Sequence, residues 1–299
     1  MLYRFGKSIT DKYLFPYNQK VWDYPPEKMD LFWVEGRVPQ PPLKDVLSSA
    51  MGLNSEGYTH QSNFFYPRVG GMQSIVDSIS KKVPQITCNF DVKSVKKEDG
   101  LWFVSDSKKE YSFKKLVSTI HLGDLISCIK DAPKEVRSAA AGLKWNSMYL
   151  VFIGLKKPKV NDLHWTYIPD SDVLPNRLSF PSNLSPNSAP KGHSSVLAEI
   201  TFDPNGPKSK LSLDEVVSKT IEDLHRINVF DKSDVVYSKA IKIKYAYVVY
   251  DLDYQKNISV LENYSKEQGI TLLGRFSEFK YYNSDKCVES AMEKAKLFV

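Results

Sequence analysis

The 299-residue sequence has few cysteines, no long hydrophobic run and no recognisable leader. Its three cysteines, Cys88, Cys128 and Cys287, are widely spaced and form no CxxC pair, which argues against a disulfide framework and against a metal site. We expect buried or neutral thiols in a reducing compartment, and therefore a cytoplasmic protein. No window of about 18 uncharged apolar residues is present, so the sequence predicts no transmembrane helix. The N-terminal MLYRFGKSITDKY lacks the apolar core and cleavage site of a signal peptide.

The short motifs of common catalytic and nucleotide-binding sites are also missing. There is no GxGxxG after a strand, no P-loop, no HExxH and no GxSxG. His60 and His121 have no Asp or Ser partner that the sequence can place, so residue patterns identify no catalytic residue. The net charge of +6 is dispersed, which disfavours nucleic-acid binding and is compatible with a small acidic substrate such as a phosphate ester.

Hydrophobic periodicity predicts helices and strands that mix without strict βαβ alternation. The Asp99-Gly100 pair between two alternating runs predicts a hairpin, and Ser212 with Glu215 predicts a capping box. Helices are expected over 3–22, 43–53, after Gly71, over 212–228, 260–269 and after Asp285, and strands over 85–97, 101–107, 114–120, 147–157, 194–202 and 234–250. This pattern indicates an α/β protein, mixed α+β in detail, with two layered sheets that share one chain.

Several polar residues lie where a binding site could form. Arg37, Arg177 and Arg275 are flanked by Gly, Pro or Asn, in segments expected to be loops or strand ends. A guanidinium group binds a diphosphate with two parallel hydrogen bonds, although a surface arginine more often pairs with a carboxylate. Tyr247 lies in a tyrosine-rich segment, and tyrosine can stack on a ring and hydrogen-bond a sugar or phosphate.

Two predicted helix starts could accept an anion. Gly70-Gly71 precedes one helix, where a tight turn and a phosphate cradle are both possible readings. Asn283, Ser284 and Asp285 precede the last helix, after Gly274 and Arg275. A helix N-terminus offers free N–H groups and a positive dipole end, so an ordinary N-cap and an anion site remain alternatives there.

The order of five segments resembles one known family. These segments are PYNQKVWDYPPEKMDLFWVEGRVPQPPLKDVL, NFFYPRVGG, LSFPSNLSP, KYAYVVYDLDY and GITLLGRFSEFKYYNSDKCVESA. Together they resemble the flavin-dependent amine oxidase superfamily, in the branch around UDP-galactopyranose mutase and protoporphyrinogen-oxidase-like proteins. The resemblance implies a two-domain fold, with an FAD-binding domain interleaved with a mixed-sheet substrate domain.

The resemblance also implies residue roles. FAD would contact Gly70, Gly71, Val92, Gly274, Arg275, Asn283, Ser284 and Asp285. The substrate would contact Arg37, Asn63, Arg177 and Tyr247. The implied organisation is a helical part of the substrate domain over 1–66, a partial FAD domain over 67–130, the substrate-domain sheet over 131–262, and a C-terminal FAD-domain strand and helix over 263–299.

The sequence departs from the family pattern in two places. It holds no strand-GxGxxG-helix unit, which in the family binds the FAD pyrophosphate, so it resembles a truncated C-terminal portion. We therefore expect that this chain alone binds FAD weakly or not at all, and that a partner chain could carry the missing unit. Leu184 stands where the mutase pattern has an aromatic residue. Three functions stay open: a flavin enzyme acting on a UDP-sugar, an amine or protoporphyrinogen oxidase, and a non-catalytic remnant or half of a split enzyme.

Overall fold

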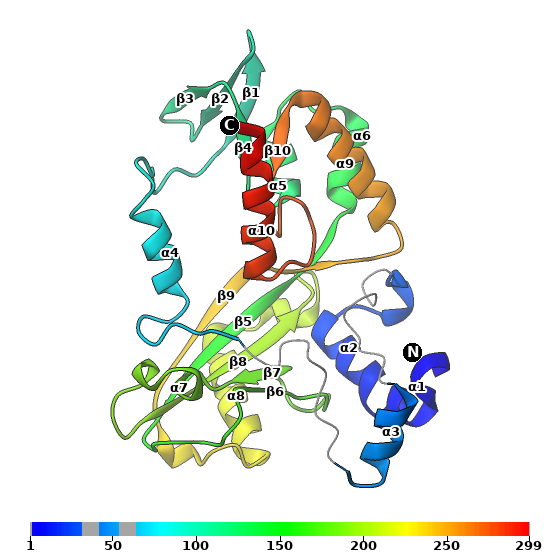
Figure 1. The fold of residues 1–299 in the computed structure, drawn as a ribbon, viewed down its shortest axis with the longest axis vertical. Helices are drawn as coiled ribbons and strands as arrows, with labels where there is room; N and C mark the ends of the chain where they lie inside the picture. Colours follow the sequence, from blue (N-terminus) through cyan, green and yellow to red (C-terminus); the bar gives the residue numbers. More distant parts are fainter. Residues whose placement is uncertain (1, 32–41, 54–63, 299) are drawn as a thin grey trace.

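The computed structural model describes residues 2–31, 42–53 and 64–298 (Figure 1). The α-helices are α1 Leu2–Ile9, α2 Phe15–Trp22, α3 Leu43–Ala50, α4 Gln73–Ser80, α5 Leu122–Cys128, α6 Lys134–Gly142, α7 Pro181–Leu184, α8 Leu213–Arg226, α9 Tyr254–Gln268 and α10 Ser284–Ala295. A π-helical turn, η1 Thr10–Leu14, joins α1 to α2, and short 3-10 turns lie at η2 Pro26–Lys28, η4 Pro186–Ser188, η5 Pro207–Lys210, η6 Lys232–Asp234 and η7 Lys296–Phe298. None of the helices in these ranges is long and apolar enough to cross a membrane.

The strands of the described residues form three sheets. They are β1 Ser94–Glu98, β2 Leu101–Ser105, β3 Glu110–Phe113, β4 Leu116–Ser118, β5 Lys144–Leu155, β6 Trp165–Tyr167, β7 Arg177–Ser179, β8 Ser194–Phe202, β9 Val235–Val249 and β10 Ile270–Leu272. The sheets have the orders β1-β2-β3, β10-β4 and β6-β7-β8-β5-β9. β4 and β10 pair in parallel, although about 150 residues separate them, so two distant parts of the chain meet there.

The five-stranded sheet was expected to be mixed, but all four of its pairings are antiparallel. The reason is the position of β5, which lies between β8 and β9 and runs opposite to both. β8 and β9 therefore point the same way, and α8 connects them as a crossover. The capping box of α8 is present, with the Ser212 Oγ accepting from the Glu215 N–H and the Glu215 carboxylate accepting from the Ser212 N–H.

One hydrophobic cluster lies under α8. Alternation along β8 turns Val196, Ala198 and Ile200 toward this cluster, where Val216 and Leu224 of α8 meet them. Each of these five side chains is almost fully buried. The intervening residues of β8 must then face the other side of the sheet, where α2 packs.

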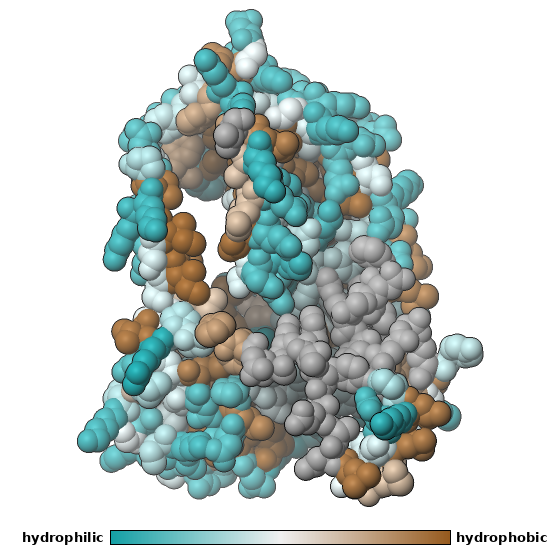
Figure 2. Space-filling model, viewed as in Figure 1, coloured by the Kyte–Doolittle hydropathy of each residue, from teal (hydrophilic) through white to brown (hydrophobic). Residues whose placement is uncertain are grey.

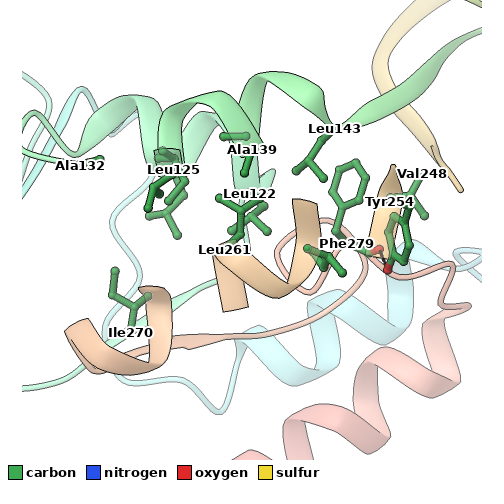
Figure 3. Close-up of a cluster of buried hydrophobic side chains, with 14 of the residues drawn as sticks. Leu122, Leu125, Ala132, Ala139, Leu143, Val248, Tyr254, Leu261, Ile270 and Phe279 are labelled. Atoms are coloured by element: carbon green, nitrogen blue, oxygen red, sulfur yellow. Dashed lines mark hydrogen bonds between the residues drawn. The ribbon is translucent and has the colours of Figure 1, made fainter. Parts of the chain in front are cut away.

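A second cluster forms between helices in the upper half of the molecule (Figure 1). Figure 3 shows Leu122 and Leu125 of α5, Ala139 of α6, Leu261 of α9 and Phe279 of the C-terminal loop converging on it. The Tyr254 hydroxyl donates to the Phe279 carbonyl oxygen over 2.8 Å, the hydrogen bond drawn in Figure 3. This cluster fixes the loop that follows β10.

Most of the expected elements are present, with local differences. The predicted strand over 85–97 begins only at Ser94, and Cys88 ahead of it is a free, exposed cysteine. The first helical region passes through Pro16 because this proline lies in the first turn of α2. Backbone N–H groups in the first turn make no hydrogen bond within the helix, so a proline there removes none. α5 and α6 were not expected from the sequence.

The predicted domain boundaries stay predictions. α6 and α9 contribute to the cluster around Phe279, and β9 contributes to both clusters, so residues 131–262 serve both halves of the molecule. Arg37 and Asn63 lie outside the described residues.

Candidate functional site

An arginine and a buried carboxylate face each other on adjacent strands. Arg177 of β7 and Glu199 of β8 are register partners, and their side chains meet at 3.3 Å between Nη1 and Oε1. Glu199 lies on the face opposite the α8 cluster and is buried. Burial raises the pKa of the Glu199 carboxyl, although Arg177 acts in the opposite direction. An ion pair between a buried carboxylate and a partly exposed arginine thus lies on the face of the sheet that α2 covers.

Aromatic rings surround this ion pair. The Arg177 guanidinium carbon is 5.9 Å from the Trp165 ring centroid and 5.8 Å from that of Tyr167, both on β6. Tyr17 of α2 packs edge-on against Tyr167 at 5.3 Å, and burial raises the pKa of its phenol well above the ordinary value. The site therefore combines one cation with flat, amphipathic side chains, a set that suits a ligand with a ring and an anionic group.

Tyr247 connects the ion pair to the C-terminal loop. Tyr247 acts with Arg177 to lower the pKa of the Glu199 carboxyl, against the larger effect of burial. Its ring stacks on Tyr281 at a centroid distance of 5.3 Å and packs edge-on against Trp22 at 6.0 Å. The Arg275 guanidinium carbon lies 4.9 Å from the Tyr247 ring and 4.6 Å from the Tyr281 ring. The structure thus brings three of the predicted residues, Arg177, Tyr247 and Arg275, into one continuous cluster.

Arg275 is held by the backbone. Nη1 donates to the Tyr282 carbonyl oxygen and Nη2 to the Ala246 carbonyl oxygen, each over 2.8 Å. A guanidinium group can serve two separate acceptors in this way because its donors are fixed in one plane. Arg275 therefore ties the loop after β10 to strand β9.

Gly274 opens that loop in a left-handed conformation, at φ 81°. Its N–H donates to the Glu278 carboxylate over 2.8 Å, and Ser290 and Lys294 of α10 bind the same carboxylate. Burial opposes ionisation, but the hydrogen bonds from Lys294, Ser290 and Gly274 together lower the pKa of Glu278. The loop is therefore anchored to α10 as well as to β9.

Asn283, Ser284 and Asp285 form the start of α10, as predicted. Asn283 is the N-cap residue in extended conformation, and its side chain makes no capping hydrogen bond. Ser284 and Asp285 are exposed. The first-turn N–H groups of this 12-residue helix are thus free to meet another group.

Four buried polar atoms lie near the carboxyl ends of β4 and β10 or in the segments that follow. Within the described part of the chain, the Ser118 Oγ, His121 Nε2, Trp145 Nε1 and Ser277 Oγ have no hydrogen-bond partner. His121 stacks on Tyr245 at 3.9 Å, and burial lowers its pKa to about 4. Carboxyl ends of parallel strands are where open α/β sheets bind ligands, so these donors fit a polar cofactor edge.

The remaining predicted residues lie elsewhere. Gly70 and Gly71 both have positive φ and form the turn before α4, and the Arg68 carbonyl oxygen ahead of them accepts from Ser185 and Asn187. Val92 is partly buried just before β1, and its carbonyl oxygen accepts from the Cys128 thiol. Within the described ranges, neither segment takes part in the cluster around Tyr247.

Sequence reasoning missed Glu199 and Tyr281. Glu199 is a charged residue in the otherwise apolar strand SSVLAEITF, and such a residue in a buried strand signals an internal ion pair. Tyr281 follows the Gly-Arg motif in a loop with no periodicity. Its place in the site becomes evident only from its stacking on Tyr247 in the structure.

The comparisons with known proteins agree with this geometry. Residues 41–296 match the family described as flavin containing amine oxidoreductase, and the chain therefore belongs to this family. The structure of a reduced UDP-galactopyranose mutase superposes on the whole chain with a TM-score of 0.89 at 22% sequence identity. A protein assigned as a protoporphyrinogen oxidase from Exiguobacterium sp. 255-15 superposes on the whole chain with a TM-score of 0.73 at 14% identity.

Putrescine oxidase is more distant, with a TM-score of 0.55 over 77% of this chain and 53% of that chain, at 14% identity. The chain spans 66% of the mutase chain and 65% of the Exiguobacterium chain. These likenesses establish the amine-oxidase-type fold, and membership of the family implies a flavin cofactor.

Proposed function

We propose that this chain forms the substrate site and the flavin-ring end of an FAD-dependent enzyme that acts on a nucleotide sugar, as UDP-galactopyranose mutase does. The observation that carries the proposal is the cluster from Arg177 through Glu199 and Tyr247 to Arg275. It joins an aromatic-lined cation to the loop that precedes α10. A substrate held at Arg177 would then lie beside the cofactor end of the site.

The chain's own residues would act mainly by binding and orienting. Arg177 would bind the diphosphate and Tyr17, Tyr167 and Tyr247 would pack against the nucleotide or sugar. Arg37 is proposed as the second diphosphate ligand and Asn63 as a further polar contact, on the strength of the sequence resemblance. Burial around Tyr247 would exclude water from the reacting sugar.

FAD would contact the N-terminal end of α10, with Gly274 and Arg275 shaping the loop beside it. The unpartnered buried donors at Ser118 and His121 fit such a polar ring. Partial positive charge at a helix N-terminus stabilises an anionic reduced ring. A bound flavin supplies the electron pair or the hydride acceptor for the chemistry, and the protein supplies position and electrostatics. Val92, Gly70 and Gly71 remain proposed contacts to the rest of the cofactor.

We also propose that a partner unit completes the FAD site. Figure 2 shows an open gap between α4 and α10, with hydrophobic atoms along the side of α4 that borders it. Ile75, Val76 and Ile79 of α4 are exposed, as are Val288 and Met292 of α10. Such apolar surface, together with a parallel sheet of only two strands, fits docking of further sheet structure.

The competing function is oxidation of an amine or porphyrinogen. It needs an apolar substrate channel, whereas the face between α2 and the sheet carries a buried ion pair. Calorimetric titration with UDP separates the two functions. Under the proposed function Arg177→Ala and Arg37→Ala each abolish UDP binding, while Lys232→Ala, which breaks an exposed ion pair with Glu222, leaves it unchanged. An unchanged affinity in Arg177→Ala would favour the oxidase.

A further inference from the structure

The Arg177 guanidinium already has a negative partner. Glu199 lies opposite it across the β7–β8 ladder, and the two side chains meet at 3.3 Å. The Glu199 side chain is 11% exposed, whereas that of Arg177 is 31% exposed. The carboxylate therefore holds the inner side of the guanidinium, and the outer side remains open.

The Arg177 guanidinium has few hydrogen-bond acceptors around it. Among the described residues its one anionic contact is Glu199, and the buried Nε atom has no hydrogen-bond partner. The face of the guanidinium is bordered by Trp165 and Tyr167, which accept no strong hydrogen bond. Several of its five N–H donors are thus available to an incoming anion.

The charged and titratable groups around Glu199 determine how its protonation responds to a bound anion. The groups that face it are Arg177 on β7 and Tyr247 on β9, and the wider cluster adds Tyr167 on β6, Tyr17 on α2, and Arg275 with Tyr281 on the C-terminal loop. Arg275 is already engaged by two carbonyl oxygens. Even with Arg37 as a second diphosphate ligand, Arg177 would have to serve a buried carboxylate and the diphosphate at the same time, which is costly in a dry site.

We infer that Glu199 is the resident counter-ion of Arg177 and takes up a proton from solvent when an anionic ligand binds that arginine. This inference rests on the proposed function and identifies a residue that positions Arg177 and sets its affinity. The proton goes to a Glu199 carboxylate oxygen, and no other bond is made or broken. The neutral acid then stays beside Tyr247 while the guanidinium turns its donors to the ligand. Burial already favours the neutral form of Glu199.

Proton uptake can be measured on the unaltered protein. UDP-glucose is a suitable probe because its diphosphate is a diester and lacks the ionisation near pH 6 of a phosphate monoester. Titration calorimetry of the full chain in two buffers of different ionisation enthalpy should show net uptake of up to one proton for each ligand bound. Affinity should fall as the pH rises from about 5.5 to about 8, because more of the protein must first be protonated. Binding with no proton uptake would overturn the inference.

The variant Glu199→Gln removes the charge and keeps an amide that can hydrogen-bond. We expect it to bind UDP-glucose at least several-fold more tightly at pH 8, with no proton uptake and a flat pH profile. Weaker binding would mean that Glu199 only holds Arg177 in place, and would contradict the inference. Glu199→Asp keeps a carboxylate and should keep proton uptake, while Glu262→Gln, at an exposed ion pair, should behave as the unaltered protein.

A third outcome concerns the function itself. If UDP-glucose binds at no pH in the range, the proposed function fails and the inference fails with it. If the ligand binds and Arg177→Ala abolishes binding, but no proton is taken up, the proposed function stands and only the role of Glu199 is wrong.

Discussion

The rings of Tyr247 and Tyr281 stack nearly parallel, with an interplanar angle of 8° and a centroid distance of 5.3 Å. Tyr247 belongs to the long strand β9, and Tyr281 belongs to the loop that leads into α10. Arg275 packs against both rings. This contact is where the proposed substrate half and the proposed flavin half of the site meet.

The first prediction concerns Arg275 as a tie between the loop and β9. Arg275→Lys should lower the free energy of unfolding by about 1.5–3 kcal/mol, the range for a hydrogen bond to a charged group. The planar guanidinium donates to the carbonyl oxygens of Tyr282 and Ala246 at once. A lysine ammonium is a compact point charge and cannot reach both. Urea denaturation followed by circular dichroism measures the change, with Arg68→Lys, at an exposed side chain, as the control that should change little. Equal stability of the two variants would refute a structural role for Arg275.

The second prediction concerns His121 and pH. Burial lowers the pKa of His121 from about 6.5 to about 4, so its folded form is neutral where the unfolded form already binds a proton. The free energy of unfolding is therefore unaffected by the titration of His121 above pH 6.5. It decreases by up to about 3 kcal/mol as the pH falls toward 4. Melting temperatures measured from pH 7 to pH 4.5 should therefore fall.

The matched variant for this effect is His121→Asn, which keeps an acceptor for the Gly123 N–H at the start of α5. It should be less stable at pH 7 but should show a shallower decline with falling pH. A slope that survives in His121→Asn would place the titrating group elsewhere.

The third prediction concerns the cofactor. Because the 299 residues contain no GxGxxG turn, the purified chain should carry well under one equivalent of flavin, judged by its visible absorbance spectrum. Addition of a separate protein unit with a strand-GxGxxG-helix fold should raise flavin retention and quench flavin fluorescence. Stoichiometric flavin bound to the chain alone would contradict this prediction.

The fourth prediction concerns the exposed apolar residues of α4. Val76→Lys should increase the monomeric fraction of the chain on gel filtration without lowering its melting temperature, because α4 contains no buried residue. Ser78→Lys adds the same charge to the same helix at an exposed polar position and should have a smaller effect. Equal effects of both variants would point to net charge rather than to the apolar surface.

Much of the fold was predictable because local rules agree with the final structure. The strand over 194–202 and the capping box at Ser212 follow directly from alternation and from side-chain chemistry. The helix ending at Gly269 ends there because only glycine adopts a left-handed φ of 77° without strain. α5 and α6 lack a strong periodic signal, and packing against α9 decides their conformation.

The site was predictable only in part. The glycine and arginine of the C-terminal motif and Arg177 stand out by residue type, whereas the Glu199 partner depends on the pairing register of β7 and β8. Register is a property of the whole sheet, so no local pattern of residues reveals it. The stack of Tyr247 on Tyr281 likewise depends on a loop closed by Arg275.

Strand β9 contributes to both hydrophobic clusters, and β5 pairs with it along most of its length (Figure 1). Val248 and Val249 of β9 belong to the cluster around Phe279, and Ala240 of the same strand belongs to the cluster under α8. Within the described residues, β9 runs from one cluster to the other as a continuous strand, and its backbone pairs with β5 along this path. Heating should consequently melt both halves in a single cooperative transition.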